Sequence, residues 1–372
     1  MNKNTSLNLP ILSIGRTVEV LSESYLSLIK AGCSPLVFPS VMLWGPPGVG
    51  KSQAVRQIAA KISKDSGKRV EVTDVRLLLF NPIDLRGIPV ANEDRTLAVW
   101  LKPKIFQMDQ SDEIVNILFL DEISAAPQSV QAAAYQITLD RVVGEHSLPD
   151  NCIVIAAGNR VTDKSVSFKM PKALANRLMH IEIEGSFASW KEWAIGAGIN
   201  SRVLGFLSFR SDVLFGFDPS NDDLAFPTPR SWEMVSNLLN HVRDDVDGMF
   251  PMIAGLIGNG TAMEFKAWCR VYRELPSLDE IFDGRAAKVP KGTDAMYALV
   301  SSMTAYAADH KFDTGRIGNS LAYAAKLPAD FAELLIQNYR CIDPDYDTFL
   351  MSIPEYLQYA AKKKVLRNGN VQ

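Results

Sequence analysis

Short apolar runs separated by helical patterns recur along the first half of the chain. The clearest runs are VMLW at 41–44, VEVTDV at 70–75, NILFLD at 116–121, CIVIAA at 152–157 and HIEI at 180–183. Runs of this kind are typical of central parallel strands, whose two faces are both covered by helices. Because helical stretches lie between them, the pattern predicts an open parallel α/β sheet.

Three segments around these runs predict further elements. Residues 12–31 carry apolar side chains at helical spacing, which predicts a helix that ends before Pro35 and Pro39. In residues 84–106, two strand-like runs flank the polar tip NEDR, which predicts a hairpin inserted near the second sheet helix. Residues 139–151 predict another short excursion before the next strand.

The second half of the chain has a different pattern, because strand signals fade after about residue 186 and helical patterns dominate. Four tryptophans there are predicted to pack in a core: Trp190, Trp193, Trp232 and Trp268. The segment 275–292 is rich in proline, glycine and charge, which predicts a linker or a long surface loop. We therefore predict three units, an α/β core, a helical lid and a C-terminal helical region, at 1–185, 186–275 and 276–372.

Composition limits the classes of protein that the chain can belong to. Of the 372 residues, 47% are hydrophobic and 22% are charged, as in soluble globular proteins. The formal net charge of -3 lacks the basic excess of a dedicated nucleic-acid binder, so nucleic acid is not the expected partner. No apolar run approaches the ~20 residues needed to span a bilayer, and the polar start MNKNTSLN lacks a signal pattern. A cytoplasmic location is expected.

Cysteines and histidines are scattered along the chain, with no C-x-x-C pair and no histidine at ligand spacing. The sequence therefore predicts neither a zinc site nor a disulfide framework. We expect reduced and mostly buried thiols at Cys33, Cys152, Cys269 and Cys341. Surface or structural roles, without chemistry, are expected for His146, His180, His241 and His310.

The strongest chemical motif is GPPGVGKS, at 45–52, which matches the phosphate-binding pattern G-x-x-x-x-G-K-[ST] between a predicted strand and a predicted helix. Its glycines let successive backbone N–H groups approach phosphate oxygens closely. Lys51 is expected to reach the β- and γ-phosphates, and Ser52 to place its hydroxyl on Mg²⁺. The candidate nucleotide-binding residues are Gly45, Pro46, Pro47, Gly48, Val49, Gly50, Lys51 and Ser52.

A second motif is ILFLDE, at 117–122, in which an apolar strand ends in two adjacent carboxylates. Ligands bind at this end of the strands in open α/β sheets, and the pattern is that of a Walker B element. Asp121 is predicted to hold Mg²⁺ through its water shell, and Glu122 to orient and polarise the attacking water. A simple helix start is the alternative, since helix N-termini also favour acidic residues. The phosphate-binding motif about seventy residues upstream favours the catalytic interpretation.

With these motifs in this order, the chain resembles an AAA+ ATPase and, within that superfamily, the MoxR group. The next sheet strand ends in AAGN, at 156–159, which is similar to sensor 1 of the family. The resemblance implies that Asn159 lies beside Glu122 and the γ-phosphate, where its amide can hold the water. Ile14 and Gly15 fall where AAA+ proteins often line the adenine pocket.

Two arginines receive roles from the resemblance. The arginine-finger segment of the family resembles KALANRLMHIEI, at 172–183, which implies that Arg177 acts on the nucleotide of a neighbouring subunit. The sensor 2 segment of the MoxR group resembles FPTPRSW, at 226–232, which implies that Arg230 points back at the nucleotide from a lid helix. Two other arginines are rivals for the finger role: Arg141 and Arg160.

The resemblance covers residues from about 10 to 275 and implies an overall function. The fold would be a P-loop AAA+ core followed by an all-α lid, and the hairpin at about 84–101 fits the insert that groups MoxR proteins with magnesium chelatase. ATP, with Mg²⁺, would be hydrolysed between the subunits of a homo-oligomeric ring, a hexamer. Hydrolysis would drive remodelling or maturation of a protein partner, one with a von Willebrand factor A domain. Residues 276–372 match no motif.

Two other functions stay open. Some AAA+ relatives with inserted hairpins act on DNA, so a nucleic-acid motor or loader is the main alternative. The net charge disfavours it, and KKK at 362–364 is more simply a charge cluster at a helix C-terminus. A switch that binds ATP without hydrolysing it is disfavoured by the presence of Glu122 and of a candidate arginine finger. Neither motif identifies the base, so ATP is preferred over GTP on the resemblance alone.

Overall fold

The computed structural model describes residues 9–160, 170, 172–218, 220–285 and 288–369. The polar start at 1–8 and the side chains of the run at 362–364 lie outside this described part. The chain divides into two compact units, Met1–Ser186 with Asp218–Asn221 and Phe187–Phe217 with Asp222–Gln372. Over the described ranges, no helix combines the length and the apolar character that crossing a membrane requires.

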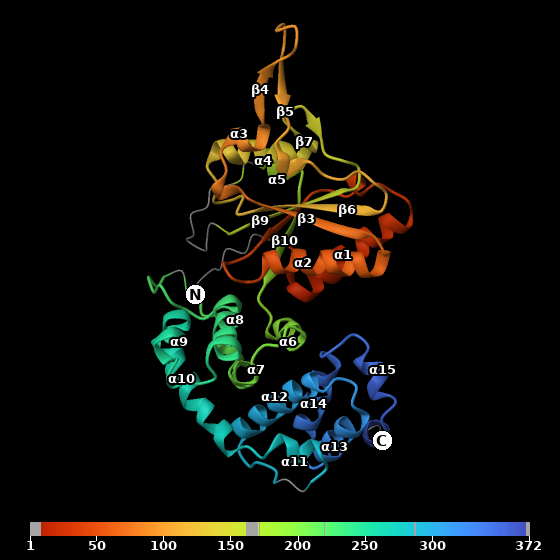
Figure 1. The fold of residues 1–372 in the computed structure, drawn as a ribbon, viewed down its shortest axis with the longest axis vertical. Coiled ribbons are helices and arrows are strands. Elements are labelled where there is room, and N and C mark those ends of the chain that lie inside the picture. The colour runs from red at the N-terminus through yellow and green to blue at the C-terminus, as the bar shows by residue number, and fades with distance from the viewer. Residues whose placement is uncertain (1–8, 161–169, 171, 219, 286–287, 370–372) are drawn as a thin grey trace. The chain divides into compact units, whose positions relative to one another are not determined.

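The first unit is built on a six-stranded parallel sheet (Figure 1). Its strands, in spatial order, are β1 (Ile11–Ser13), β10 (Met179–Glu184), β2 (Val41–Trp44), β9 (Cys152–Gly158), β6 (Ile114–Asp121) and β3 (Arg69–Arg76). The five apolar runs that predicted strands are confirmed as β2, β3, β6, β9 and β10. Strand β1 was not predicted, because its three residues run directly into a helix and the last two of them fell within the predicted helix over 12–31.

The central strands owe their place to their apolar side chains. All seven residues of β9 are buried, as are seven of the eight in β6. Trp44 at the end of β2 pairs with Gly158 at the end of β9, and Leu120 of β6 pairs with Ala156. Since the strands are parallel, their C-terminal ends meet at one edge of the sheet.

Helices cover both faces of this sheet (Figure 1). On one face, α1 (Ile14–Lys30) packs against α2 (Lys51–Ser66). On the other face lie α3 (Pro82–Arg86) and α4 (Gln128–Asp140), with the short α5 (Lys172–Ala175) before β10. Buried residues of α4 share an apolar cluster with the strands; these include Val130, Ala134, Ile137, Met42, Leu118 and Val154. The predicted helix over 12–31 is present as α1.

This unit also contains two small antiparallel strand pairs. In the segment where the sequence predicts the inserted hairpin, β4 (Ile88–Ala91) pairs with β5 (Ala98–Leu101). In the segment of the predicted excursion, β7 (Val142–Val143) pairs with β8 (His146–Ser147). Three 3₁₀ turns complete the unit: η1 (Pro35–Val37), η2 (Leu77–Leu79) and η3 (Lys104–Phe106).

The second unit is helical in all its regular elements that the structure describes. Its α-helices are α6 (Phe187–Gly196), α7 (Ser201–Phe209), α8 (Pro229–Asn237), α9 (Phe250–Ile257), α10 (Asn259–Cys269), α11 (Leu278–Phe282), α12 (Thr293–Asp309), α13 (Thr314–Ala324), α14 (Ala329–Arg340), α15 (Tyr346–Leu350) and α16 (Pro354–Gly369). Shorter turns are η5 (Ser211–Leu214), η6 (Leu238–Val242) and η7 (Arg270–Glu274). One apolar cluster contains buried side chains from Trp190 to Tyr356, on both sides of residue 275. The separate third unit from 276 stays a prediction.

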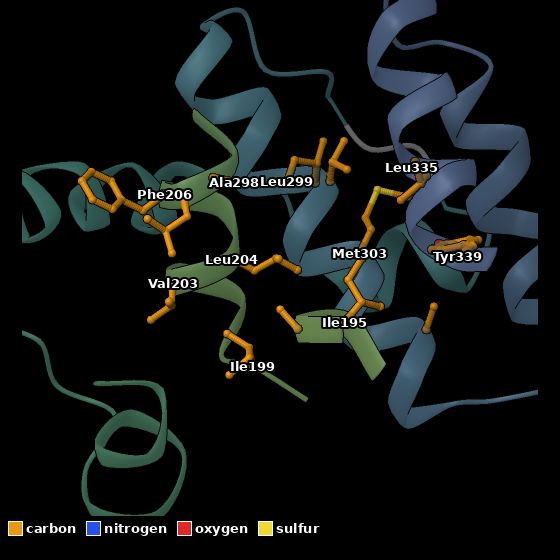
Figure 2. Packing of buried hydrophobic residues seen from close by; sticks show 14 of the residues in the cluster. Ile195, Ile199, Val203, Leu204, Phe206, Ala298, Leu299, Met303, Leu335 and Tyr339 are labelled. Atoms are coloured by element: carbon orange, nitrogen blue, oxygen red, sulfur yellow. The ribbon is translucent and has the colours of Figure 1, made fainter. Parts of the chain in front are cut away.

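Helix α12 lies at the centre of this cluster, between α7 and α14 (Figure 2). Ala298, Leu299 and Met303 of α12 lie among Leu204 of α7 and Leu335 of α14. A helix that is buried around most of its circumference belongs to the interior of a domain. Three of the predicted core tryptophans are buried, and the fourth is partly buried and packs against the cluster: Trp190, Trp232, Trp268 and Trp193.

Phe206 of α7 tests this core, because its ring lies 5.6 Å from Trp232, 5.4 Å from Phe265 and 5.7 Å from Trp268, centroid to centroid. Phe206→Ala should lower the free energy of unfolding by about 3–5 kcal/mol, because it removes a buried ring and leaves a cavity. Phe209→Ala is the matched control on the same helix, where the side chain is 42% exposed, and should cost about 1 kcal/mol or less. Urea denaturation measures both, and equal losses would contradict the assigned core.

Candidate active site

The loop at 45–50 joins β2 to α2 at the sheet edge where the strand ends meet. Gly45 N donates a hydrogen bond to Gly158 O, at 3.3 Å, so the loop is tied to the end of β9. Gly50 precedes α2 with a φ of 107°, a backbone conformation that residues other than glycine rarely adopt. A Cβ there would lie 2.7 Å from Ile14 Cδ1. Ile14, at the start of α1 and before Gly15, therefore packs directly on this loop.

Lys51 is the first residue of α2 and is only 9% exposed. Its Nζ donates to Gly45 O at 2.7 Å, to Pro46 O at 3.1 Å and to Asn159 Oδ1 at 2.8 Å. Burial of an ammonium is costly unless its donors are hydrogen-bonded, and these three oxygens meet that condition. The lysine of the first motif and the asparagine after β9 therefore meet, although 108 residues separate them.

Ser52 and Asp121 form the second pair of predicted site residues that the fold brings together. Ser52 Oγ donates to Asp121 Oδ2 at 3.0 Å, across 69 residues of chain. Hydroxyl and carboxylate oxygens are the hard ligands that Mg²⁺ prefers, so these two side chains fit the predicted metal. The pair lies at the start of α2 and the end of β6, at the same edge as Lys51.

Glu122 follows β6 with a φ of 59°, a left-handed conformation that is uncommon for residues other than glycine. Its backbone N–H donates to Asp121 Oδ1 at 2.9 Å, and Ile123 N donates to Ala157 O at 3.0 Å. The turn after β6 is thus fixed against the end of β9. Residues held in sparsely populated backbone regions cluster at functional sites.

Two residues near this turn were not identified from the sequence. Ser124 Oγ accepts a hydrogen bond from Asn159 N at 2.9 Å. Because every residue except proline offers a backbone N–H, this contact leaves no pattern in the sequence. Asp74 lies on β3, where desolvation and then the nearby Asp121 carboxylate raise its pKa above the usual range. An acidic residue inside a strand-like run is a weak signal, and only the pairing of β3 with β6 reveals it.

The two rival arginines are engaged within their own unit. Arg141 ends α4 with a φ of 57° and donates to Cys152 O at 3.3 Å and to Phe38 O at 3.1 Å. Burial lowers the pKa of its guanidinium. Arg160 forms an ion pair with Glu182 of β10, whose side chain is 5% exposed.

The two preferred arginines are both exposed. Arg177 lies between α5 and β10 and makes no ion pair with any residue that the structure describes. Arg230 lies in the first turn of α8, whose N-cap Thr228 accepts from Ser231 N at 3.1 Å. It belongs to the second unit, whereas Arg177 belongs to the first. The roles of both stay predictions.

Neither the histidines nor the cysteines were expected to have a chemical role, and some of them have structural hydrogen bonds instead. His180 Nδ1 accepts from Trp44 Nε1 at 2.9 Å, and its Nε2 donates to Ala175 O at 2.7 Å. These bonds hold the segment before β10 against β2. All four cysteines are free, and burial raises the pKa of Cys152 and Cys269 to about 12. Cys33 is exposed and Cys341 is partly exposed, so the expectation of mostly buried thiols holds for only two of the four.

Comparison with solved structures gives distant matches. A putative ATPase from Cytophaga hutchinsonii is 14% identical, with 87% of this chain and 92% of that chain covered and a TM-score of 0.31. A RuvB variant from Thermotoga maritima is 15% identical, with coverage of 78% and 81% and a TM-score of 0.36. NtrX from Brucella abortus, in complex with ADP, is 15% identical, with coverage of 92% and 70% and a TM-score of 0.36. Among curated protein sequences, none matches this chain.

A family model gives a more direct match to the site itself. Residues 40–180 match the model described as "ATPase family associated with various cellular activities (AAA)". The matched segment contains the phosphate-binding loop, the acidic end of β6, Asn159 and Arg177. Over residues 40–180, the chain is therefore similar to this family of ATPases.

Proposed function

We propose that this chain hydrolyses ATP as an AAA+ ATPase of the MoxR type. The observation that carries the proposal is the meeting of separate motifs, with Lys51 Nζ 2.8 Å from Asn159 Oδ1 and Ser52 Oγ 3.0 Å from Asp121 Oδ2. Phosphoryl transfer to water depends on positioning and charge neutralisation more than on covalent chemistry. The site supplies a cation, a hydroxyl, a carboxylate and an amide for that purpose.

Each residue has a separate role in this reaction. The phosphates would accept hydrogen bonds from the loop backbone, from the start of α2 and from Lys51. Ser52 and Asp121 would hold Mg²⁺, which supplies positive charge against the phosphate oxygens. Glu122 would polarise the attacking water, and Asn159 would hold that water in line. Ile14 and Gly15 would line the adenine.

The proposal extends to assembly and partner on the strength of the resemblance. Subunits would form a homo-oligomeric ring, a hexamer, in the cytoplasm, with Arg177 of one subunit acting on ATP in the next. Arg230 would contact the nucleotide from the helical unit. Hydrolysis would remodel or mature a protein partner with a von Willebrand factor A domain. The hairpin β4–β5, which exposes Ile88 and Leu101, would contribute to partner contact.

Two substitutions separate ATP binding from hydrolysis. Lys51→Ala should abolish ATP binding, because it removes the side-chain cation that the phosphate-binding loop places against the β- and γ-phosphates. Glu122→Gln should still bind ATP while turnover falls by ~10²–10⁴-fold, because the amide cannot accept the proton of the water. Titration with a fluorescent ATP analogue and a phosphate-release assay measure the two effects.

Lys64→Ala, the same change at an exposed position of α2, is the control and should alter neither ATP binding nor turnover. Equal ATP binding by the first two variants would contradict the assigned site.

The partner is tested by a pull-down in Mg-ATP. A Glu122→Gln subunit that binds ATP without turnover should retain its bound partner, since release would require hydrolysis. A Lys51→Ala subunit should retain none. Mass spectrometry of the eluates identifies what is specific to Glu122→Gln. If the two eluates were the same, coupling of this ATPase to a protein partner would be wrong.

Action between subunits is tested at Arg177. Arg177→Ala should bind ATP nearly normally and hydrolyse it ~10³-fold more slowly, because a guanidinium no longer stabilises charge on the γ-phosphoryl oxygens. Mixing it with Lys51→Ala subunits should restore part of the activity, because some interfaces then pair an intact loop with an intact finger. The measurement is ATPase activity across mixing ratios under conditions of subunit exchange.

The control for this mixing experiment replaces Lys51→Ala with a subunit that carries both substitutions. No interface in that mixture combines Lys51 with Arg177, so activity should stay at the level of the parents. If exchange is confirmed and the first mixture also stays at that level, Arg177 does not act between subunits.

A further inference from the structure

Ser124 is a buried hydroxyl at the centre of the site, two residues after Glu122. Its side chain is 3% exposed, and its Oγ accepts a hydrogen bond from Asn159 N at 2.9 Å. Its own backbone is held by Gln131, whose Nε2 donates to Ser124 O at 3.3 Å and to Ala126 O at 2.9 Å. Gln131 of α4 therefore holds the backbone of Ser124, and the Ser124 hydroxyl contacts the residue that follows β9.

The glycine before Asn159 makes this contact possible. A Cβ at Gly158 would lie 2.8 Å from Ser124 Oγ and 2.8 Å from Met42 Cε, which is closer than real Cβ contacts. Any larger residue at 158 would therefore push Ser124 away from Asn159 N. Close contact with Ser124, in the turn after β6, thus explains why the residue before Asn159 is a glycine.

The end of β9 is tied at three successive residues. Ile123 N donates to Ala157 O at 3.0 Å, Gly45 N donates to Gly158 O at 3.3 Å, and Asn159 N donates to Ser124 Oγ. Two of these ties come from the turn after β6, and one comes from the phosphate-binding loop. With its backbone held in this way, Asn159 extends its Oδ1 to 2.8 Å from Lys51 Nζ.

We propose that Ser124 is a positioning residue that aims the Asn159 amide at the γ-phosphate and the attacking water; this inference rests on the proposed ATPase function. Ser124 acts through the backbone of Asn159 and does not itself contact the nucleotide. Without the hydroxyl, the backbone N–H of Asn159 loses its acceptor and the side-chain amide loses its fixed direction. Misplacement of a positioning group by about 1 Å can lower a rate by ~10²-fold.

Ser124→Ala should therefore separate hydrolysis from binding. The Kd for Mg-ATP should stay within about twofold, while kcat falls by ~10- to 100-fold. The decisive measurement is a double-mutant cycle with Asn159→Ala. In the Asn159→Ala background, no amide remains to be aimed, so adding Ser124→Ala should leave kcat unchanged.

Ser40→Ala is the matched control for the loss of a buried hydroxyl. Ser40 is 2% exposed, precedes β2 at the opposite end of the strand from the loop, and donates to Thr138 O. Both serine variants should lower the unfolding temperature by a few degrees at most, since each removes one buried hydrogen bond. Only Ser124→Ala should lower kcat.

Three results would overturn the inference. The first is a Ser124→Ala protein with unchanged kcat while the unmodified protein hydrolyses ATP. The second is an equal loss of kcat in both backgrounds of the cycle, which indicates a general structural effect. The third is a loss of Mg-ATP affinity that accounts for the lower activity. If the unmodified protein bound and hydrolysed no ATP, the proposed function would be wrong, and the role of Ser124 with it.

Discussion

The candidate active site depends on the parallel pairing of three strands, β2, β9 and β6. Trp44 pairs with Gly158, and Leu120 pairs with Ala156, so the three strands end together. The chemical groups follow within a few residues of these ends. A slip of one residue in any pairing would turn the alternating side chains to the other face and separate these groups. The buried side chains of β9 and β6 make such a slip costly, so apolar packing fixes the polar geometry.

The polar contacts at this edge are possible only once the strands are paired, and they then satisfy each other. Lys51 finds three oxygens, Ser52 finds a carboxylate, and the N–H of Asn159 finds a hydroxyl. Under the proposed function, phosphate oxygens compete with Gly45, Pro46 and Asn159 for the lysine. Movement of Lys51 toward phosphate would release the Asn159 amide, so occupancy of the loop and orientation of the water would be linked.

The sequence predicts much of this arrangement because the relevant signals are local. Runs of apolar residues predict five of the six strands, and the residues that meet come from the motifs at 45–52 and 117–122 and from AAGN at 156–159, which the resemblance singled out. The three-residue β1 is too short for a pattern of its own. Ser124 could not be found in this way, since its partner is a backbone N–H that any residue at 159 would offer. The left-handed backbone of Glu122 is a property of the folded turn and has no sequence signal here.

The three arginines weighed for the finger role differ in what it costs to release them. A finger must deliver an unpaired guanidinium to another chain. Withdrawing Arg141 would leave the carbonyls of Cys152 and Phe38 without this donor in the interior of the first unit.

Withdrawing Arg160 would leave the buried carboxylate of Glu182 without this ion-pair partner, which is unfavourable because a buried charge is costly when it is unpaired. Oε2 of Glu182 already has no hydrogen-bond partner in the part of the chain that the structure describes. Arg177 is exposed and has no ion pair there to break. Under the proposed function, movement of its guanidinium to the phosphate of a neighbouring subunit would break no ion pair among the described residues, which favours Arg177 among the three.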